Sequence, residues 1–180
     1  MKLKTSIILS AAAIGVSVPA IADPVWDLYV GATIGAGAET IFADDKNEIN
    51  AAQSVGARFG VDLPAFRFET EYNYLSEKRD LHAHLGMLNA YFKMPSTVIK
   101  PYLGLGVGLM FGGENENKHI DFDTTAAYQA MLGVTLDVAA LPFKFDIEGR
   151  ALYLPDIYKV NDIQPDILHY EARIKIRYIF

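Results

Sequence analysis

The sequence contains no cysteine, so disulfides cannot stabilise the fold and no thiolate is available as a nucleophile or metal ligand. Basic residues are also scarce, since 16 Lys and Arg stand against 22 Asp and Glu, a formal net charge of −6. Such a surface is a poor partner for nucleic acid. After residue 22 no apolar run approaches the roughly 18 residues of a membrane helix, although 51% of the chain is hydrophobic. These shortages argue against redox chemistry, nucleic-acid binding and a helical membrane protein.

Residues 1–22 have the layout of a secretory signal peptide. Two lysines precede an apolar stretch at 7–18, and Ala20 and Ala22 place small residues beside a cleavable bond. The apolar stretch is too short, and too rich in Ala, Gly and Ser, for a membrane anchor. We expect export and cleavage after Ala22. The remaining residues, 23–180, are enough for a single domain.

Eight segments alternate apolar with polar or small residues, about one every twenty positions. In the clearest, 66–75, four aromatic residues and Thr70 alternate with Arg, Glu and Asn. Because successive side chains of a strand point to opposite faces, each segment predicts a strand with one apolar face. The predicted strands are Trp26–Thr40, Gln53–Val61, Phe66–Leu75, Ala83–Lys93, Tyr102–Gly112, Ala126–Asp137, Phe143–Tyr153 and Tyr170–Phe180.

The connections between these segments alternate in length. The longer, polar ones are 41–52, 76–82, 113–125 and 154–167. The shorter ones, which contain proline, are 62–65, 95–101 and 139–142. Aromatic residues gather near the segment ends, as in the girdles of membrane barrels. The pattern predicts an all-β fold, an eight-stranded antiparallel up-and-down transmembrane β-barrel with both termini on one side.

The strands of a soluble β-sandwich or a lipocalin-like barrel also alternate apolar with polar residues, and their apolar face is turned toward a core. Periodicity alone does not separate these folds from a membrane barrel. Glycines on the polar face of 102–112, the aromatic residue at the end of the sequence and the unequal connections all favour the membrane barrel.

Segments 26–32, 101–108 and 170–180 give the chain a wider resemblance. It resembles bacterial outer-membrane β-barrel proteins, in particular the transmembrane domain of outer-membrane protein A and the small opacity or surface-antigen barrels. The resemblance implies a monomer in the bacterial outer membrane, reached through the periplasm and in contact with membrane lipid and lipopolysaccharide. It also implies that Tyr178 and Phe180, in the final strand, form a signal for the outer-membrane assembly machinery.

If the apolar face meets lipid, the charged face lines the barrel interior. Eight strands leave room for little more than their own side chains, and buried charges must be paired or hydrated. We therefore expect an ion-pair network rather than a wide pore, with inner-face glycines making room for long side chains. Its predicted members are Arg58, Arg67, Glu69, Glu71, Lys144, Asp146, Glu148, Arg150, Glu171, Arg173, Lys175 and Arg177, with Asp27, Lys93 and Asp137 on the same face.

No segment carries a motif for catalysis, a metal or a cofactor, so the sequence predicts a non-enzymatic protein. We expect a structural or surface-interaction, adhesin-like role through external loops such as 44–48 and 113–119, which offer sites for a host or surface ligand. A narrow, porin-like channel of low conductance is one alternative. A lipid-modifying enzyme is another, because Ser76, Glu77, Asp80, His82 and His84 are neighbours in sequence. The His pair with Asp80 is too weak a spacing to predict a metal site.

Overall fold

A computed structural model of the chain describes residues 26–43, 46–77, 81–94, 99–115, 120–121, 124–137, 141–155 and 166–180. The predicted signal peptide, with Ala20 and Ala22, lies outside these residues. Within them, no helix is long and apolar enough to cross a membrane. The strands are β1 (Asp27–Ala43), β2 (Lys46–Asp62), β3 (Phe66–Glu77), β4 (Leu81–Lys93), β5 (Ile99–Asn115), β6 (Ile120–Asp121), β7 (Thr125–Asp137), β8 (Phe143–Leu154) and β9 (Asp166–Ile179).

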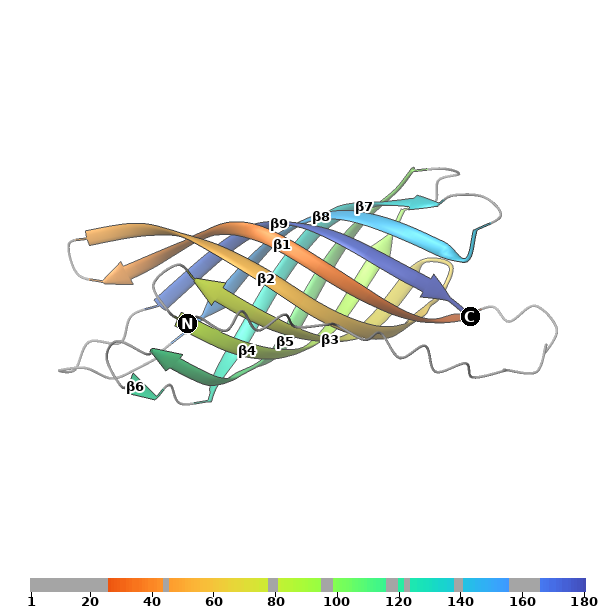
Figure 1. Cartoon of the computed structure of the whole chain (residues 1–180). Helices are drawn as coiled ribbons and strands as arrows, with labels where there is room; N and C mark the ends of the chain where they lie inside the picture. Colours follow the sequence, from red (N-terminus) through yellow and green to blue (C-terminus); the bar gives the residue numbers. More distant parts are fainter. Residues whose placement is uncertain are drawn as a thin grey trace, which may run out of the picture.

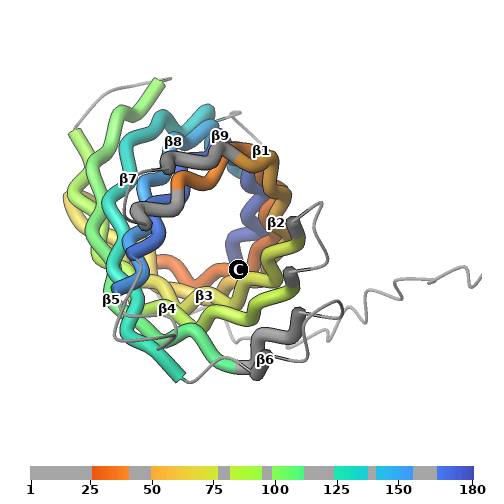
Figure 2. Tube along the Cα trace, turned by 90° about the vertical axis from the view of Figure 1, so that its left-hand side faces the viewer, coloured from red at the N-terminus to blue at the C-terminus, as the bar shows by residue number. Residues whose placement is uncertain are grey.

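The eight long strands form a closed antiparallel barrel (Figure 1). Each pairs with its neighbour in sequence, and β1 pairs with β9 to close the ring that Figure 2 shows end-on. The two-residue β6 pairs with the end of β5. This arrangement confirms the predicted eight-stranded up-and-down barrel.

The strand pleat separates the side chains as the alternation predicts. On β3, Phe68 is 51% exposed on the outward face, whereas Arg67 and Glu69 beside it point inward and are buried. Large apolar side chains continue around the outside, with Leu105 on β5 reaching 70% exposure. A soluble protein rarely exposes so large an apolar surface. The lipocalin-like alternative is wrong because it requires the apolar set inside and the charged set outside.

The two ends of the barrel differ. At the end that we call the short-turn end, three residues join β2 to β3, and Leu63 N donates to Phe66 O at 2.8 Å. Outward rings gather there, including Phe143 and Tyr178 with centroids 5.3 Å apart. We call the opposite end the long-strand end. Its outward side chains include Tyr72, Tyr128, Tyr153 and Tyr170, so aromatic residues flank the apolar band on both sides.

Several strands are longer at the long-strand end than the sequence predicts. β1 reaches Ala43 and β2 starts at Lys46, so most of the predicted connection 41–52 is paired strand. β3 and β4 likewise extend into 76–82, and β5 extends to Asn115. The prediction ended each strand where polar residues begin. Polarity does not interrupt the backbone hydrogen bonds of a hairpin, so pairing continues beyond the apolar band.

Candidate functional site: the filled barrel interior

Charged side chains from five strands, β1, β2, β3, β8 and β9, converge inside the barrel. Register sets several of them directly opposite one another: Arg58 faces Glu71 across β2 and β3, and Glu148 faces Arg173 across β8 and β9. The buried cations are Arg58, Arg67, Arg150, Arg173, Lys175 and Arg177. The buried carboxylates are Glu39, Asp62, Glu69, Glu71, Asp146, Glu148 and Glu171. The two signs are nearly balanced, as charges removed from water require.

Two aspartates hold the network together at the short-turn end. Arg177 donates from Nε to Asp146 Oδ2 at 2.8 Å and from Nη2 to Asp146 Oδ1 at 2.9 Å, a bidentate arrangement. Its Nη1 reaches Asp62 Oδ2 at 3.1 Å. Asp62 also binds Lys93 and lies 3.6 Å from Lys144 Nζ. One guanidinium therefore joins three strands across the interior.

The middle of the interior is organised around Glu148 and Glu69. Glu148 binds Lys175 Nζ at 2.5 Å, Arg173 Nε at 2.9 Å and the Tyr102 hydroxyl at 2.9 Å. Glu69 accepts hydrogen bonds from the hydroxyls of Tyr29 at 2.8 Å and Tyr91 at 2.9 Å. Two cations and a hydroxyl therefore satisfy Glu148, and two hydroxyls together with Arg58 Nη1, at 3.4 Å, satisfy Glu69.

Two further carboxylates complete the network toward the long-strand end. Glu71 accepts from Arg173 Nη1 at 2.8 Å and from Arg58 Nη2 at 3.0 Å. Glu171 lies 2.7 Å from Arg150 Nη2 and 3.1 Å from His169 Nε2. The ion pairs therefore extend over successive levels of the barrel.

Aromatic rings and glycines fit together around Arg67. Its guanidinium carbon lies 4.0 Å from the Tyr91 ring centre and 4.6 Å from that of Tyr102, within cation–π range. The rings occupy space left by glycines on neighbouring strands. A Cβ on Gly104 would lie 2.5 Å from Tyr91, and one on Gly133 would lie 2.5 Å from the Tyr102 hydroxyl.

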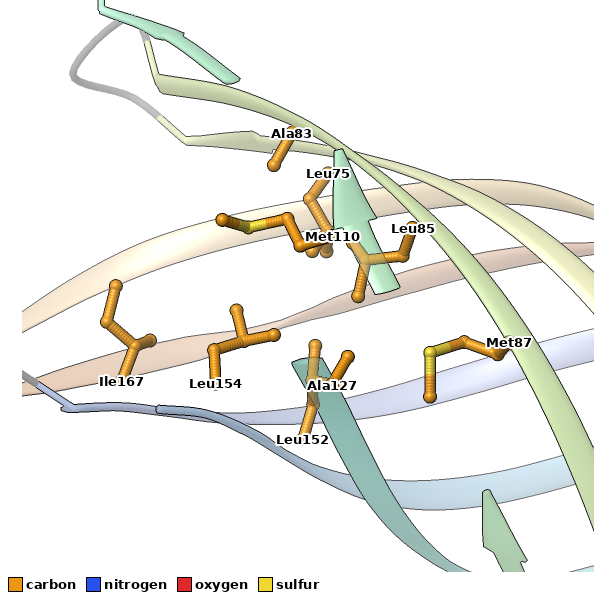
Figure 3. Packing of buried hydrophobic residues seen from close by; sticks show 9 residues of the cluster. All are labelled: Leu75, Ala83, Leu85, Met87, Met110, Ala127, Leu152, Leu154 and Ile167. Carbon is orange, nitrogen blue, oxygen red and sulfur yellow. The ribbon is translucent and has the colours of Figure 1, made fainter. Parts of the chain in front are cut away.

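Apolar side chains fill the interior beyond the ion pairs, toward the long-strand end (Figure 3). Leu85 and Leu152 are 0% exposed and Met87 is 1% exposed. The cluster consists of Leu75, Ala83, Leu85, Met87, Met110, Ala127, Leu152, Leu154 and Ile167. An apolar layer thus lies on the long-strand side of the charged one. This apolar layer was not predicted from the sequence.

The structure places eleven of the twelve residues predicted for the network in the buried interior. Lys144 is the exception, because its side chain stays 19% exposed at the short-turn end. Asp137 pairs with Lys100 at 2.6 Å, partly exposed, outside the main network. Sequence reasoning missed Asp62, which it placed in a turn. It also missed the buried hydroxyls and amides, although strand parity places them on the inner face: Tyr29, Tyr91, Tyr102, Asn89, Gln129 and Thr135.

Ser76 and His82, from the predicted enzyme alternative, lie opposite each other in the β3–β4 register at the long-strand end. His82 Nδ1 lies 2.8 Å from the Tyr74 hydroxyl, and His84 Nδ1 lies 2.6 Å from that of Tyr72. Among the residues with described contacts, no three His, Asp or Glu side chains gather as a metal ion would require. The Glu77 side chain and Asp80 lie outside the described part of the chain.

Solved structures of small membrane barrels match this chain over most of its length. Neisserial surface protein A matches with a TM-score of 0.65 and 19% identity, over 85% of this chain and 97% of that one. The outer membrane enzyme PagL matches with a TM-score of 0.58 and 12% identity, over 81% and 97%. The N-terminal β-barrel domain of Pseudomonas aeruginosa OprF matches with a TM-score of 0.55 and 14% identity, over 83% and 97%.

The fold is that of the small outer-membrane barrels. No family model matches the sequence. No curated protein shows detectable sequence similarity to it. At these identities the structural likeness concerns the barrel itself, and proteins sharing it include one described as an enzyme and one as a surface protein.

Proposed function

We propose that the chain is a non-enzymatic barrel of the bacterial outer membrane, whose role is structural or consists of surface interaction through its external loops. The observation that carries the proposal is the filled interior. Arg173, Lys175 and Arg177 are at most 1% exposed, and they lie beneath an apolar layer that includes the fully buried Leu85 and Leu152. Among the described residues, an interior filled in this way stabilises a scaffold and disfavours a substrate chamber.

Two features support the membrane location. The outward apolar band matches a hydrocarbon environment, and the aromatic rings at its borders match the two interfaces. We place the long-strand end outside the cell, since the longer connections join the strands there. Lipid and lipopolysaccharide are then the immediate neighbours of the outward face. Tyr178 and Phe180 lie outward at the short-turn end, where an assembly factor has access to them, and Phe180 N donates to Leu28 O at 3.0 Å.

A narrow channel is the less supported alternative. Water or ions crossing the barrel would have to pass both the paired charges and the apolar layer. Removing a charge from its partners in a low-dielectric interior costs several kcal/mol per ion, and an apolar constriction also opposes ion passage. A non-conducting barrel agrees with both layers.

An enzymatic role has one structural argument, the register that sets Ser76 of β3 and Glu114 of β5 opposite His82. The ring nitrogen Nδ1 of His82 is engaged by Tyr74 rather than by an acid, which a Ser-His-acid arrangement requires. Comparison of membrane lipids from cells expressing the native chain and Ser76→Ala tests this role. We expect identical lipid profiles; a modified lipid that disappears with the variant would make the protein an enzyme.

The surface role is tested on intact cells. Replacing residues 113–119 by a Gly-Ser linker of equal length should abolish adherence to cultured host cells while leaving the barrel in the outer-membrane fraction. The matched control replaces 96–98, which join β4 to β5 at the short-turn end, and should keep adherence unchanged. Equal adherence of cells with the native chain, with either variant and without the protein would leave only the structural role.

A further inference from the structure

Two histidines form an aromatic cluster with three other rings on the outward face at the long-strand end. Tyr72 and Tyr74 come from β3, His82 and His84 from β4, and Phe111 from β5. The centroids of Tyr74 and His82 are 5.6 Å apart with the rings nearly parallel, and Tyr74 lies 5.3 Å from His84. His84 in turn stacks on Phe111 at 6.1 Å. The cluster is continuous across three strands.

Each histidine is oriented by a tyrosine hydroxyl. The Tyr74 hydroxyl lies 2.8 Å from His82 Nδ1, and the Tyr72 hydroxyl lies 2.6 Å from His84 Nδ1. A phenol that donates to Nδ1 leaves the proton of the neutral imidazole on Nε2. A protonated imidazole also carries hydrogen on Nε2. With the phenol donating, Nε2–H of each ring is a donor in both states, and the two rings stand on one outward patch.

A simple aromatic girdle does not need this arrangement. The other outward rings named at the same end, Tyr128, Tyr153 and Tyr170, belong to β7, β8 and β9 and have no histidine opposite them in register. The stacked rings fix the imidazole planes, and the hydroxyls fix which nitrogen faces away. A ligand with several acceptor oxygens therefore meets donors that are already positioned.

We infer that His82 and His84 bind a phosphate group of an outer-leaflet glycolipid, with Tyr72 and Tyr74 as positioning residues. The inference rests on the proposed membrane location, which puts this cluster at the level of the lipid headgroups. Phosphate offers acceptor oxygens and negative charge to two N–H donors, whereas the surrounding rings suit the carbohydrate and upper acyl region. The shared chemistry is phosphate; lipid-linked and free phosphate are separated by experiment.

The test titrates the purified full barrel, in neutral detergent, with bisphosphorylated lipid A. Imidazole ¹⁵N spectra should show shifts of Nε2 of His82 and His84 on binding. His82→Phe or His84→Phe, which keeps a ring and removes the donor, should weaken binding about tenfold, as expected for one hydrogen bond to a charged group. The double variant should weaken it by more than tenfold. Tyr128→Phe, on the outward face of β7, is the matched control and should bind like the native chain.

Two further ligands distinguish lipid-linked phosphate from free phosphate. Dephosphorylated lipid A should bind at least tenfold more weakly, and inorganic phosphate should bind weakly because it lacks the apolar part. Equal binding of both lipid A forms, or unchanged binding by the double variant, would show that the cluster does not bind phosphate and is only part of an aromatic girdle. Inorganic phosphate binding as tightly as lipid A would overturn the lipid assignment. Tyr72→Phe with Tyr74→Phe should change the imidazole tautomer signals, which a purely structural role of the hydroxyls would not do.

Cell fractionation reports the location of the chain independently of lipid A binding. It therefore distinguishes failure of the phosphate site from failure of the proposed function. A barrel found in the outer membrane whose His variants bind lipid A normally would contradict only the phosphate site.

Discussion

Buried side chains in this barrel are stabilised by partners from strands distant in sequence. Asp146 shows the principle, because its two oxygens receive Arg177 twice and Thr135 once, and Arg67 lies 3.4 Å away. Removing one partner of such a group leaves buried charge without compensation. Pairs near the ends are different, since water already solvates them.

Asp146→Ala should therefore destabilise the barrel by about 3–5 kcal/mol, the usual cost of breaking a buried ion pair. The matched control is Asp137→Ala, whose partner Lys100 has a side chain that is 33% exposed. Its expected cost is about 0–1 kcal/mol. Urea-induced unfolding in lipid vesicles measures both free energies. Equal losses would show that burial of Asp146 does not determine its contribution.

Gly→Ala substitutions provide a second comparison between the inward and outward faces of the barrel. Gly104→Ala places a Cβ 2.5 Å from the Tyr91 ring and should cost about 1–3 kcal/mol of unfolding free energy through overpacking. Gly149→Ala faces outward, where the nearest atom to the new Cβ is 3.8 Å away. It should be neutral or gain up to about 1 kcal/mol. A neutral Gly104→Ala would mean that the tyrosine packing adapts freely.

Each strand carries two environments, and the strands in which they differ most were the easiest to predict. On β3, charged residues alternate with aromatic residues and Thr70 over 66–72, so both the strand and its inward residues follow from the sequence. On β8, Leu152 and Leu154 point inward beside outward apolar residues, and alternation loses its contrast there. The apolar interior layer was missed for that reason.

The alternating pattern does not determine which strand residues pair with one another. Parity places Glu148 and Arg173 inside, but their contact depends on the register between β8 and β9. Asp62 was missed because it ends β2 beside a proline-containing turn, where polar residues are ordinarily solvated. The strand extensions near Ala43 and Lys46 were missed because backbone pairing produces no recognisable pattern in a polar sequence.

A lysine scan along the outward face should map the position of the membrane. Ile147→Lys, midway along β8, should destabilise the barrel by about 2–4 kcal/mol, as a lysine does at the bilayer midplane. Ile99→Lys, at the start of β5, should cost about 0–1 kcal/mol because it lies near an interface. Unfolding in vesicles reports both values. Equal and small costs would contradict a hydrocarbon environment at Ile147.

The barrel as a whole combines an apolar exterior with an interior that side chains fill at two levels. Paired charges occupy the short-turn end and the middle, and apolar side chains cover them toward the long-strand end. Both layers support the proposal of a non-conducting barrel. We therefore propose that the strands serve as a scaffold and that interactions take place on the outward face and the loops.

Planar-bilayer conductance of the purified, folded protein is the most direct test of this account. Glu71→Ala and Arg150→Ala serve as interior variants, and heat-modified electrophoretic mobility confirms folding of each sample. We expect no steady unitary current from the native barrel. Steady unitary currents from the native chain, altered in size or selectivity by either substitution, would show an open path through the interior and contradict it.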